Sequence, residues 1–404
     1  MPLRGKHVVL GVCGSIALFK AADLASKLVQ AGSVVDVVMT DSAQEFVTPF
    51  TFRSLTGRPV YTNMFKPVTD AGEEHVALAR RANLVVIAPA TATTIARLAH
   101  GLADDMLSLT VLATRAPVLV APAMDSQMWE AAVTQENVAA LRGRGVEFVG
   151  PDTGRLASGS LGAGRLSEPA TILGAAKLVL ARTGDLAGQQ IVVSAGGTRE
   201  PIDPVRVLTN RSSGKMGYAL AEAARDRGAK VTLVSTVDSL PVPYGVEQVA
   251  VETVSQMREA VLEACRTATV LIMAAAMSDF RPATTAEQKI KKGEGGELIL
   301  QLVQNPSFFP EVPDRVVKVA FAAESQNLIE NALRKPQSHG HLDLICANDV
   351  SAEGAGFGVD TNLVTLIEPG SEPETLPLLP KYEVAVLILD RVRAITERRG
   401  LNSH

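Results

Sequence analysis

Residues 7–39 read HVVLGVCGSIALFKAADLASKLVQAGSVVDVVM, and this stretch decides the fold. His7–Val12 and Val34–Met39 are short, continuous apolar runs, which are typical of strands buried on both faces. Between them, Ile16–Gln30 has the amphipathic spacing of a helix. Two buried strands joined by a helix predict a βαβ unit with parallel strands and a right-handed crossover. The opening stretch therefore predicts an α/β fold.

The same alternation continues through the first half of the chain. Further buried strands are expected at Leu84–Ala88, Val118–Ala121 and Glu147–Val149, and a closing helix at Pro169–Arg182. These elements predict a doubly wound, Rossmann-like domain with helices on both faces of a parallel sheet. The pattern lapses at Gly150–Arg165, where glycine occupies positions 150, 154, 159, 162 and 164. Such a stretch predicts a mobile loop or a backbone-contact segment, and not a strand.

A second domain follows a polar, glycine-bearing joint at Thr183–Gln189. We expect the first domain to span residues 1–186 and the second residues 187–404. The second repeats the design of the first, with a helix at Gly217–Gly228 and a closing helix near Lys381–Arg398. Its expected strands are Gln190–Ser194, Val231–Ser235, Val270–Ala274, Val316–Ala320, Leu342–Ala347 and Leu363–Ile367. The chain is thus predicted to hold two doubly wound domains in tandem, the second with a mostly parallel sheet.

Composition excludes several classes of protein. Of 404 residues, 47% are hydrophobic and 20% are charged, which is typical of globular and not of disordered chains. A net charge of −4 gives no electrostatic footprint for nucleic acid or an anionic membrane. Cys13, Cys265 and Cys346 lack zinc-site spacing and favour a reducing compartment. With no run of ~18 apolar residues and no signal-peptide pattern, we expect a cytoplasmic protein.

Three glycine or serine turns follow predicted strands. They are Gly11–Ser15, Gly196–Thr198 and Ser212–Gly217. Each could present free backbone N–H groups at a helix N-terminus to a phosphate, or could be an ordinary strand-to-helix connection. None has the spacing of the dinucleotide fingerprint or the P-loop.

Several ionisable residues stand where an open α/β sheet binds ligands. His75 begins a helical stretch and is either a solvated helix end or a base or hydrogen-bond donor at the sheet edge. Asp125 follows a buried strand and is either a helix cap or a catalytic carboxylate. Asp279 follows another strand, which favours a Mg²⁺ or hydroxyl partner over a structural role. Lys289–Lys292 is either a solvated basic run or a charge clamp for polyphosphate.

Together these residues resemble the family of bifunctional coenzyme A biosynthesis flavoproteins over nearly the whole chain. This family joins phosphopantothenoylcysteine decarboxylase to a CTP-dependent phosphopantothenate–cysteine ligase. In the first half the resemblance rests on Gly14–Ala17, His75, Ala88–Thr91, Pro122–Met124 and Gly150–Asp152. In the second half it rests on Gly197–Arg206, Asn210, Ser212–Gly217, Asp279, Lys289–Lys292, Asn305–Pro306, Phe321–Glu324 and Asp343–Asn348.

For the first half, the resemblance implies a flavodoxin-like flavin domain. FMN would be held by Gly14, Ser15, Ile16, Thr40, Pro89, Ala90 and Thr91. In the family, flavin takes a hydride from the substrate's cysteine side chain, and the resulting thioaldehyde is the electron sink for loss of CO₂. His75 matches the histidine that assists this oxidation. An asparagine orients the substrate carboxylate, and a cysteine on a glycine-rich flap protonates the enethiolate.

Two of these catalytic positions differ here. Asp125 stands at the asparagine position, where an ionised carboxylate would repel the carboxylate that it should hold unless it stays protonated. Ser158 stands at the cysteine position, and an alcohol is a far weaker general acid than a thiol. The resemblance therefore predicts a decarboxylase that is impaired, or that stops at the enethiol with its flavin reduced.

For the second half, the resemblance implies a ligase that forms an acyl-cytidylate, which cysteine attacks with release of CMP. Asn210 matches the residue that handles the acyl-cytidylate, and Lys289 matches the lysine that promotes its conversion. Asp279 matches a nucleotide- and metal-binding position, where Mg²⁺ would offset phosphate charge. The other nucleotide-binding positions are Met273, Ala274, Ala275, Pro306, Ser307, Phe308, Phe309 and Phe321.

One departure concerns the triphosphate of CTP. The family carries two lysines before its Asp-Leu-Ile strand, and Pro336 and Gly340 hold these positions here. Lys335 could replace one of them, and His339 or His341 could weakly replace the other. We therefore expect a CTP affinity that is weakened and sensitive to salt.

Three functions are open from the sequence. The chain is a bifunctional enzyme, or a ligase whose flavin-binding domain is only an oligomerisation scaffold, or a flavin-domain regulator that binds protein partners. The substrates implied for the enzyme are phosphopantothenate, cysteine and CTP. The resemblance also implies homo-oligomers, with trimeric flavin domains that share sites between subunits and with dimeric ligase domains.

Overall fold

The computed structural model describes residues 2–66, 73–291, 298–324, 329–330, 341–349 and 354–401. The chain forms two compact units, Met1–Arg182 and Thr183–His404, each with hydrophobic cores of its own. The residues expected at or beside the triphosphate, Lys335, Pro336, His339 and Gly340, lie outside the described residues, as does Lys292.

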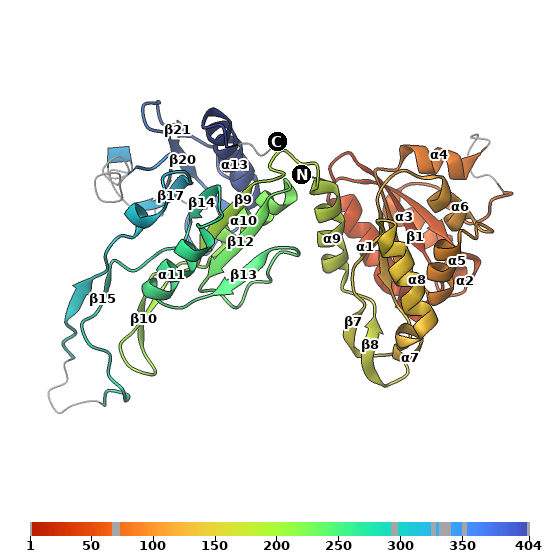
Figure 1. Ribbon diagram of the computed structural model, residues 1–404, viewed down its shortest axis with the longest axis horizontal. Coiled ribbons are helices and arrows are strands. Elements are labelled where there is room, and N and C mark those ends of the chain that lie inside the picture. Colours follow the sequence, from red (N-terminus) through yellow and green to blue (C-terminus); the bar gives the residue numbers. More distant parts are fainter. Residues whose placement is uncertain are drawn as a thin grey trace. The chain divides into compact units, whose positions relative to one another are not determined.

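The sheet of the first unit has parallel strands in the order β3-β2-β1-β4-β5-β6. Figure 1 draws this unit in red to yellow-green, with β1 labelled. They are β1 (His7–Val12), β2 (Val34–Met39), β3 (Val60–Tyr61), β4 (Leu84–Ala90), β5 (Val118–Pro122) and β6 (Glu147–Phe148). The chain runs outward from β1 to β3 and then returns to β4, so the strand order reverses between β1 and β4. Such a reversal opens a crevice at the carboxyl ends of the strands.

Helices cover both faces of this sheet. On one face lie α1 (Phe19–Gln30), α3 (Pro49–Thr56) and α9 (Pro169–Ala181), and on the other α4 (Glu74–Arg81), α5 (Ala92–His100), α6 (Met106–Ala113) and α8 (Ala132–Gly143). Val8 and Leu10 face the first layer and Val9 faces the second, which is why this strand is apolar throughout. A 3-10 turn, η1 (Ile16–Leu18), precedes α1, and the short helices α2 (Asp41–Gln44) and α7 (Ser126–Glu130) follow β2 and β5. The doubly wound fold is thereby confirmed.

The glycine-rich segment after β6 is a β-hairpin, so the prediction that it contains no strand is wrong. β7 (Asp152–Arg155) pairs antiparallel with β8 (Leu161–Arg165). Its glycines permit close approach: a Cβ on Gly164, whose φ is 147°, would lie 2.3 Å from the carbonyl oxygen of Met124. A Cβ on Gly162 would lie 2.7 Å from Ser126 Cβ. Side chains at these positions would hold the hairpin away from the segment that follows β5.

The sheet of the second unit has the order β13-β12-β9-β14-β17-β18-β20-β21. Its strands are β9 (Gln190–Ala195), β12 (Lys230–Ser235), β13 (Glu247–Ala250), β14 (Val270–Met273), β17 (Val317–Glu324), β18 (Leu344–Asp349), β20 (Val364–Ile367) and β21 (Glu374–Thr375). The pairs from β13 to β18 are parallel, and β20 and β21 join antiparallel. The mostly parallel sheet is thus confirmed.

Helices cover this sheet as well. α10 (Lys215–Asp226) and α13 (Lys381–Arg398) pack on one face, and α11 (Val254–Ala264) packs on the other with η2 (Phe309–Glu311). The described α10 begins at Lys215, two residues before the predicted start. Three small hairpin-like sheets extend from the unit: β10 (Arg199–Pro201) with β11 (Val207–Thr209), β15 (Phe280–Pro282) with β16 (Leu302–Gln304), and β19 (Thr361–Asn362) with β22 (Leu379–Pro380). Among the described helices, none has the length and apolar character needed to cross a bilayer.

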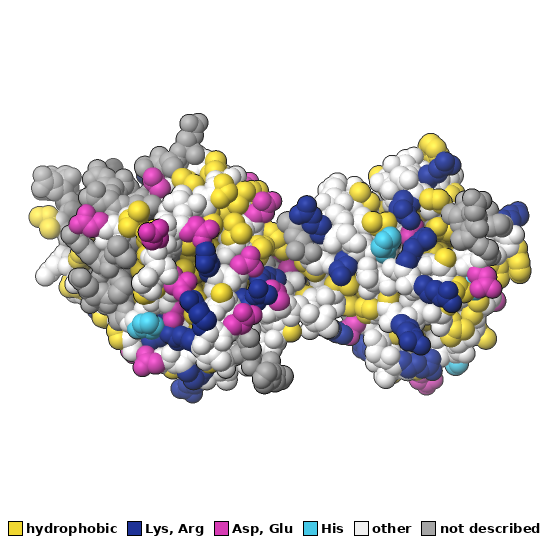
Figure 2. Space-filling view, turned by 90° about the horizontal axis from the view of Figure 1, so that it is seen from above, with side chains coloured by type: hydrophobic (Ala, Val, Ile, Leu, Met, Phe, Trp, Pro, Cys, Tyr) yellow, Lys and Arg dark blue, Asp and Glu magenta, His cyan; other side chains and the backbone are white. Residues whose placement is uncertain are grey.

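Large apolar side chains are exposed on both units, and hydrophobic surface is visible on the face drawn in Figure 2. In the first unit Phe19, Phe50 and Phe65 are 66%, 73% and 82% exposed. In the second unit Val205, in the β10–β11 connection, and Phe280, on β15, are also exposed. Exposed apolar patches often mark interfaces between protein molecules.

Candidate active sites

The residues predicted to bind flavin gather at the carboxyl edge of the first sheet. Gly14 follows β1, Thr40 follows β2, and the Pro89-Ala90-Thr91 segment ends β4 and begins α5. Because β1 lies between β2 and β4, the three strand ends are neighbours. The N–H of Cys13 donates to the carbonyl oxygen of Pro89 at 3.3 Å. The structure thus brings together residues from three separate motifs.

Local geometry at this edge suits a tightly seated ligand. A Cβ on Gly14 would lie 2.5 Å from Ser42 Cβ, so glycine is needed for the turn to approach α2. Ser15 Oγ accepts from the Ala17 N–H at 3.3 Å, beside Ile16 at the start of η1. Thr40 Oγ1 is buried and has no hydrogen-bond partner among the described residues. Because an unpaired buried hydroxyl is costly, this orphan atom indicates a partner that a bound ligand would supply.

A cavity of about 390 Å³ lies at the same edge. Its wall contains Ser15, Ile16, Lys20, Asp125, Arg155, Ser158 and Arg165 among others. The turn after β1, the segment after β5 and the β7–β8 hairpin therefore meet around one space.

Asp125 and Ser158 are hydrogen-bonded to each other. Ser158 Oγ donates to Asp125 Oδ2 at 2.9 Å, and it shares a further bond of 2.8 Å with Ser160 Oγ. Asp125 Oδ1 accepts from the Gln127 N–H at 3.0 Å, so Asp125 is the N-cap of α7. Asp125 is thus a helix cap, and it also lies in the cavity wall, where a catalytic role would place it.

His75 and the cysteines do not line this cavity. His75 is the second residue of α4 and is half-buried. Cys13 is buried next to the Gly14 turn, where Thr94 Oγ1 donates to its Sγ at 3.2 Å and burial raises the pKa of its thiol to about 11. Cys265 and Cys346 are buried in the second unit. None of the three cysteines, all of which lie within the described residues, therefore lines the cavity that contains Ser158.

A larger cavity, of about 670 Å³, lies at the carboxyl edge of the second sheet. Its wall contains predicted residues Asn210, Met273, Ala274, Ala275, Asp279, Phe309 and Phe321, together with the whole Ser212–Gly217 turn. Pro306, Ser307 and Lys289 are exposed and stand outside this wall. Phe308 is buried in the core, with its ring stacked 6.2 Å from that of Phe309. The structure thus brings most of the predicted nucleotide residues together.

Asn210 and Asp279 occupy different settings in this cavity. Asn210 Nδ2 donates to the carbonyl oxygens of Ala276 and Met277, at 3.2 and 3.0 Å, and so ties the segment after β14 in place. Asp279 is exposed. Among the described residues, no three His, Cys, Asp or Glu side chains are grouped to share a metal ion. A single carboxylate is compatible with Mg²⁺, which is commonly held by waters and substrate phosphates.

Lys289 is positioned by a clamp that the sequence did not reveal. The neighbouring Ile290 N–H donates to Asp203 Oδ2 at 3.1 Å, and its carbonyl oxygen accepts from Arg206 Nη2 at 2.8 Å. Arg206 also donates to Asp203 through Nε, at 2.9 Å, and this guanidinium holds the pKa of Asp203 well below its usual range. Arg206 lies in a matched run, but no spacing rule links that run to residue 290.

Lys381 is a second residue that sequence reasoning missed. It begins α13 and lines the larger cavity. Its Nζ donates to the carbonyl oxygens of Gly356 (3.1 Å), Thr361 (2.9 Å) and Val359. Burial lowers the pKa of Lys381 to about 8. A lysine at the start of an amphipathic helix normally indicates a solvated end, so the sequence carried no signal of this burial.

His341 is not among the residues that line the larger cavity, and its expected role beside the triphosphate stays a prediction. It precedes β18 at the amino edge of the sheet, opposite the cavity. There its Nε2 lies 3.2 Å from Asp343 Oδ1 and 2.8 Å from Arg399 Nη2.

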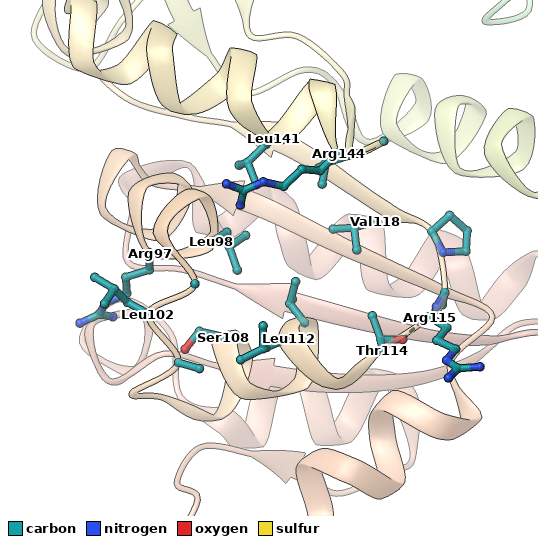
Figure 3. A pocket seen from close by; sticks show the side chains of 17 residues that line it. Arg97, Leu98, Leu102, Ser108, Leu112, Thr114, Arg115, Val118, Leu141 and Arg144 are labelled. Carbon is teal, nitrogen blue, oxygen red and sulfur yellow. Dashed lines mark hydrogen bonds between the residues drawn. The ribbon is translucent and has the colours of Figure 1, made fainter.

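A further cavity, of about 420 Å³, lies at the amino ends of β5 and β6 in the first unit. Figure 3 shows Leu98, Leu112 and Val118 in this cavity, with Arg97 and Arg115 toward its ends. None of the predicted site residues lines it, and it lies at the edge of the sheet opposite the residues predicted to bind flavin.

Comparison with known protein families matches both units. Residues 1–179 match the family described as "Flavoprotein". Residues 186–395 match the family described as "DNA/pantothenate metabolism flavoprotein C-terminal domain".

Individual relatives match nearly the full chain. "Coenzyme A biosynthesis bifunctional protein CoaBC" of Vibrio vulnificus (strain YJ016) is 44% identical over 398 residues, which cover 97% of this chain and 98% of that protein. The protein of the same name from Bacillus subtilis (strain 168) is 44% identical over 407 residues, which cover 99% and 100%. A crystal structure of the C-terminal domain of a CoaBC protein is 36% identical and covers 54% of this chain and 100% of its own, with a TM-score of 0.46.

Proposed function

The chain belongs to the family of bifunctional coenzyme A biosynthesis proteins, and from this premise we propose that its two units act in turn on one substrate. The second unit joins phosphopantothenate to cysteine with consumption of CTP. The first unit decarboxylates the resulting phosphopantothenoylcysteine to phosphopantetheine. The observation that carries this proposal is that each unit has a cavity at the carboxyl edge of its sheet, lined by residues expected for its half of the chemistry.

FMN is the cofactor that fits the first unit. The unpaired Thr40 hydroxyl and the Gly14 turn lie at neighbouring strand ends, and the Flavoprotein family match covers both. When bound, FMN would supply a two-electron acceptor that converts the cysteine side chain to a thioaldehyde, the electron sink for loss of CO₂. A Thr40→Val variant removes the hydroxyl and keeps the side-chain volume, so we expect ~10-fold weaker FMN binding, as for the loss of one hydrogen bond.

The chain's own residues would move protons at this site. In this proposal His75 assists removal of the thiol proton, and Ser158 is the donor nearest to the carbon that loses CO₂. Because His75 lies outside the cavity of its own chain, we propose that it serves a neighbouring subunit of a homo-oligomer. The exposed Phe19, Phe50 and Phe65 support such an interface. Mixing inactive His75→Asn and Ser158→Ala chains should then restore part of the activity, because some sites of the mixed oligomer would be complete.

In the second unit, we assign the ligase roles to residues that line the larger cavity or lie next to the clamp. Asn210 would bind the acyl-cytidylate, since its amide is fixed by two carbonyl oxygens and its own carbonyl oxygen is left to face the ligand. Lys289 lies outside the wall of this cavity, next to the clamped Ile290, and would promote conversion of the acyl-cytidylate by offsetting the phosphate charge of the departing CMP. Asp279 would hold Mg²⁺ together with the phosphates of CTP.

One observation favours a second candidate function. The single proton of the Ser158 hydroxyl is directed at Asp125, and a serine so engaged is a poor general acid. The chain would then be a ligase whose flavin-binding unit turns over slowly or not at all.

One experiment separates these functions. The purified protein is given phosphopantothenate, cysteine, CTP and Mg²⁺ without oxygen, while CMP, CO₂ and flavin absorbance are followed. CMP with stoichiometric CO₂ supports the bifunctional enzyme, and CMP alone supports the ligase with a non-catalytic flavin unit. Production of neither would refute both. An Asn210→Asp variant is the control, since it should lose CMP formation and still decarboxylate added phosphopantothenoylcysteine.

A further inference from the structure

Arg155 stands out among the cations of the flavin-unit cavity. Lys20 and Arg165 also line this cavity, but both form ion pairs with Glu168, Lys20 at 2.9 Å. Arg155, the last residue of β7, is exposed and has no ion-pair or hydrogen-bond partner within the described part of the chain. The cavity therefore holds one guanidinium whose charge is not offset by a neighbouring carboxylate.

Asp125, which lines the same cavity, is already hydrogen-bonded through both of its carboxylate oxygens. One of its carboxylate oxygens accepts from the Gln127 N–H and the other from Ser158 Oγ. An ionised carboxylate can only accept hydrogen bonds, so Asp125 has no donor to offer a ligand. A substrate carboxylate therefore needs a hydrogen-bond donor other than Asp125 in this cavity, and a cation would also offset the negative charge of Asp125.

We propose that Arg155 binds the carboxylate of the acyl-cysteine substrate, the group that leaves as CO₂. The proposal deepens the decarboxylase half of the proposed function and rests on it. Guanidinium matches a carboxylate with two parallel N–H···O bonds, which fix its orientation as well as its position.

The chemistry of the step places this carboxylate near Ser158. When the Cα–carboxylate bond breaks, its electron pair moves into the Cα–Cβ bond, and the thioaldehyde sulfur becomes the enethiolate sulfur. The proton that completes the product is then added to Cα, the atom that has just lost CO₂. The group that donates this proton must therefore lie close to the position that the carboxylate occupied before it left. Arg155 and Ser158 lie three residues apart on one hairpin and line one cavity, which is compatible with this requirement.

The hairpin also explains how one segment supplies both groups. Gly162 and Gly164 seat it against Met124 and Ser126, next to Asp125. Arg155 pairs with Leu161 across the hairpin, so its backbone is held in a strand while its side chain reaches the cavity. Arg155 is therefore a specificity-determining residue carried on a rigid element.

The test uses the full-length FMN-loaded protein and ligands that cannot react. Phosphopantothenoylserine keeps the carboxylate and phosphate but has no thiol to oxidise. Phosphopantothenoyl-ethanolamine lacks only the carboxylate, and pantothenoylserine lacks only the phosphate. Binding is followed by perturbation of the flavin absorbance, which reports the flavin site and not the second unit. Variants Arg155→Ala and Arg155→Lys are compared with Arg115→Ala, which removes the same charge at the opposite edge of the sheet.

For Arg155→Ala we expect phosphopantothenoylserine to bind ~10- to 100-fold more weakly, as for loss of a charge-assisted hydrogen bond. Phosphopantothenoyl-ethanolamine should bind unchanged, Arg155→Lys should recover part of the affinity, and Arg115→Ala should match the wild type. Equal loss for both phosphorylated ligands, with pantothenoylserine unaffected, would assign Arg155 to the phosphate and overturn the proposal. No change for any ligand would overturn it as well. If the wild type binds none of the ligands, the decarboxylase assignment itself fails. Failure of the proposed function can therefore be distinguished from failure of the role proposed for Arg155.

Discussion

Replacing Ser158 with cysteine should restore fast completion of the decarboxylation, above all when Asp125 is replaced by asparagine at the same time. In the wild type the Ser158 hydroxyl donates its proton to Asp125 Oδ2, with 2.9 Å between the two oxygens, and its oxygen is 2.8 Å from Ser160 Oγ. The proton therefore has to leave one acceptor before it can reach the substrate. A thiol at this position would be both a stronger acid and a weaker donor to Asp125.

The size of the effect has two parts. A well-matched general acid contributes ~10²–10⁴-fold to a protonation step. Breaking a hydrogen bond to a charged acceptor costs ~1.5–3 kcal/mol, and exposure of Ser158 favours the lower end, or about 10-fold. Ser158→Cys alone leaves the new thiol beside a carboxylate, which raises the pKa of the thiol and reduces the gain. The double variant with Asp125→Asn removes that opposing charge, so we expect it to be the fastest.

The assay is anaerobic stopped-flow mixing with phosphopantothenoylcysteine. Flavin absorbance should bleach as the substrate is oxidised and recover as the enethiolate is protonated and reduced to phosphopantetheine. Ser158→Cys should leave the bleaching rate within a few-fold of the wild type and raise the recovery rate ~10²-fold or more. Ser158→Ala is the matched control, with recovery no faster than the wild type.

Two results would refute this reasoning. Wild-type recovery that is as fast as its bleaching, over many turnovers, would mean that Ser158 or another group is already an adequate acid. Recovery that stays slow in the Ser158→Cys, Asp125→Asn double variant would mean that proton delivery at position 158 is not the limiting step.

Three further predictions concern the clamp, the loop before β19 and the hairpin. Asp203→Asn should free Ile290 and lower CMP formation ~10-fold, as for loss of one charge-assisted hydrogen bond, with flavin content unchanged as the control. Since the pKa of Lys381 is about 8, raising the pH through that value removes one of the three N–H donors that hold the cavity loop. CMP formation should therefore decline above about pH 8 in the wild type. The Lys381→Arg variant, which stays charged, should lack this inflection. Gly164→Ala should displace the hairpin from Met124 and destabilise the first unit by ~1–3 kcal/mol. The measurement is the melting temperature reported by the flavin signal, which should fall. Gly159→Ala, at the exposed hairpin tip, should have a smaller effect.

The fold could be predicted because short runs of sequence determine each of its strands and helices. Apolar runs such as His7–Val12 and Val34–Met39 state directly that both faces of a strand are buried, and the intervening helix then fixes a parallel pair. The hairpin after β6 was not predictable in the same way. Its glycines are compatible with a mobile loop or with a backbone-contact segment, and the sequence does not decide between them. Gly164 is needed because the carbonyl oxygen of Met124, some forty residues earlier in the chain, occupies the space of a side chain. Such a constraint exists only once the chain has folded.

The candidate site residues likewise include some that the sequence could predict and some that it could not. Residues that follow strands, such as Asp125 and Asp279, could be placed at the edge where open α/β sheets bind ligands, because parallel strands all end there. Residues that act through long-range backbone contacts could not. Asp203 holds the Lys289 segment through the backbone of Ile290, and Lys381 holds a loop through carbonyl oxygens, so neither follows a spacing rule in the sequence.

The two altered positions in the flavin unit make more sense as parts of one arrangement than as separate losses. Two unit charges 4 Å apart interact by ~1 kcal/mol in water and ~4 kcal/mol at the effective dielectric constant of a protein surface. An aspartate in place of an amide would therefore weaken binding of a carboxylate ligand by a similar amount. Arg155 contributes an attraction of the same order within the same cavity, which offsets this repulsion. The hydrogen bond from Ser158 further spreads the charge of Asp125, so the three side chains together can accept an anion that Asp125 alone would reject.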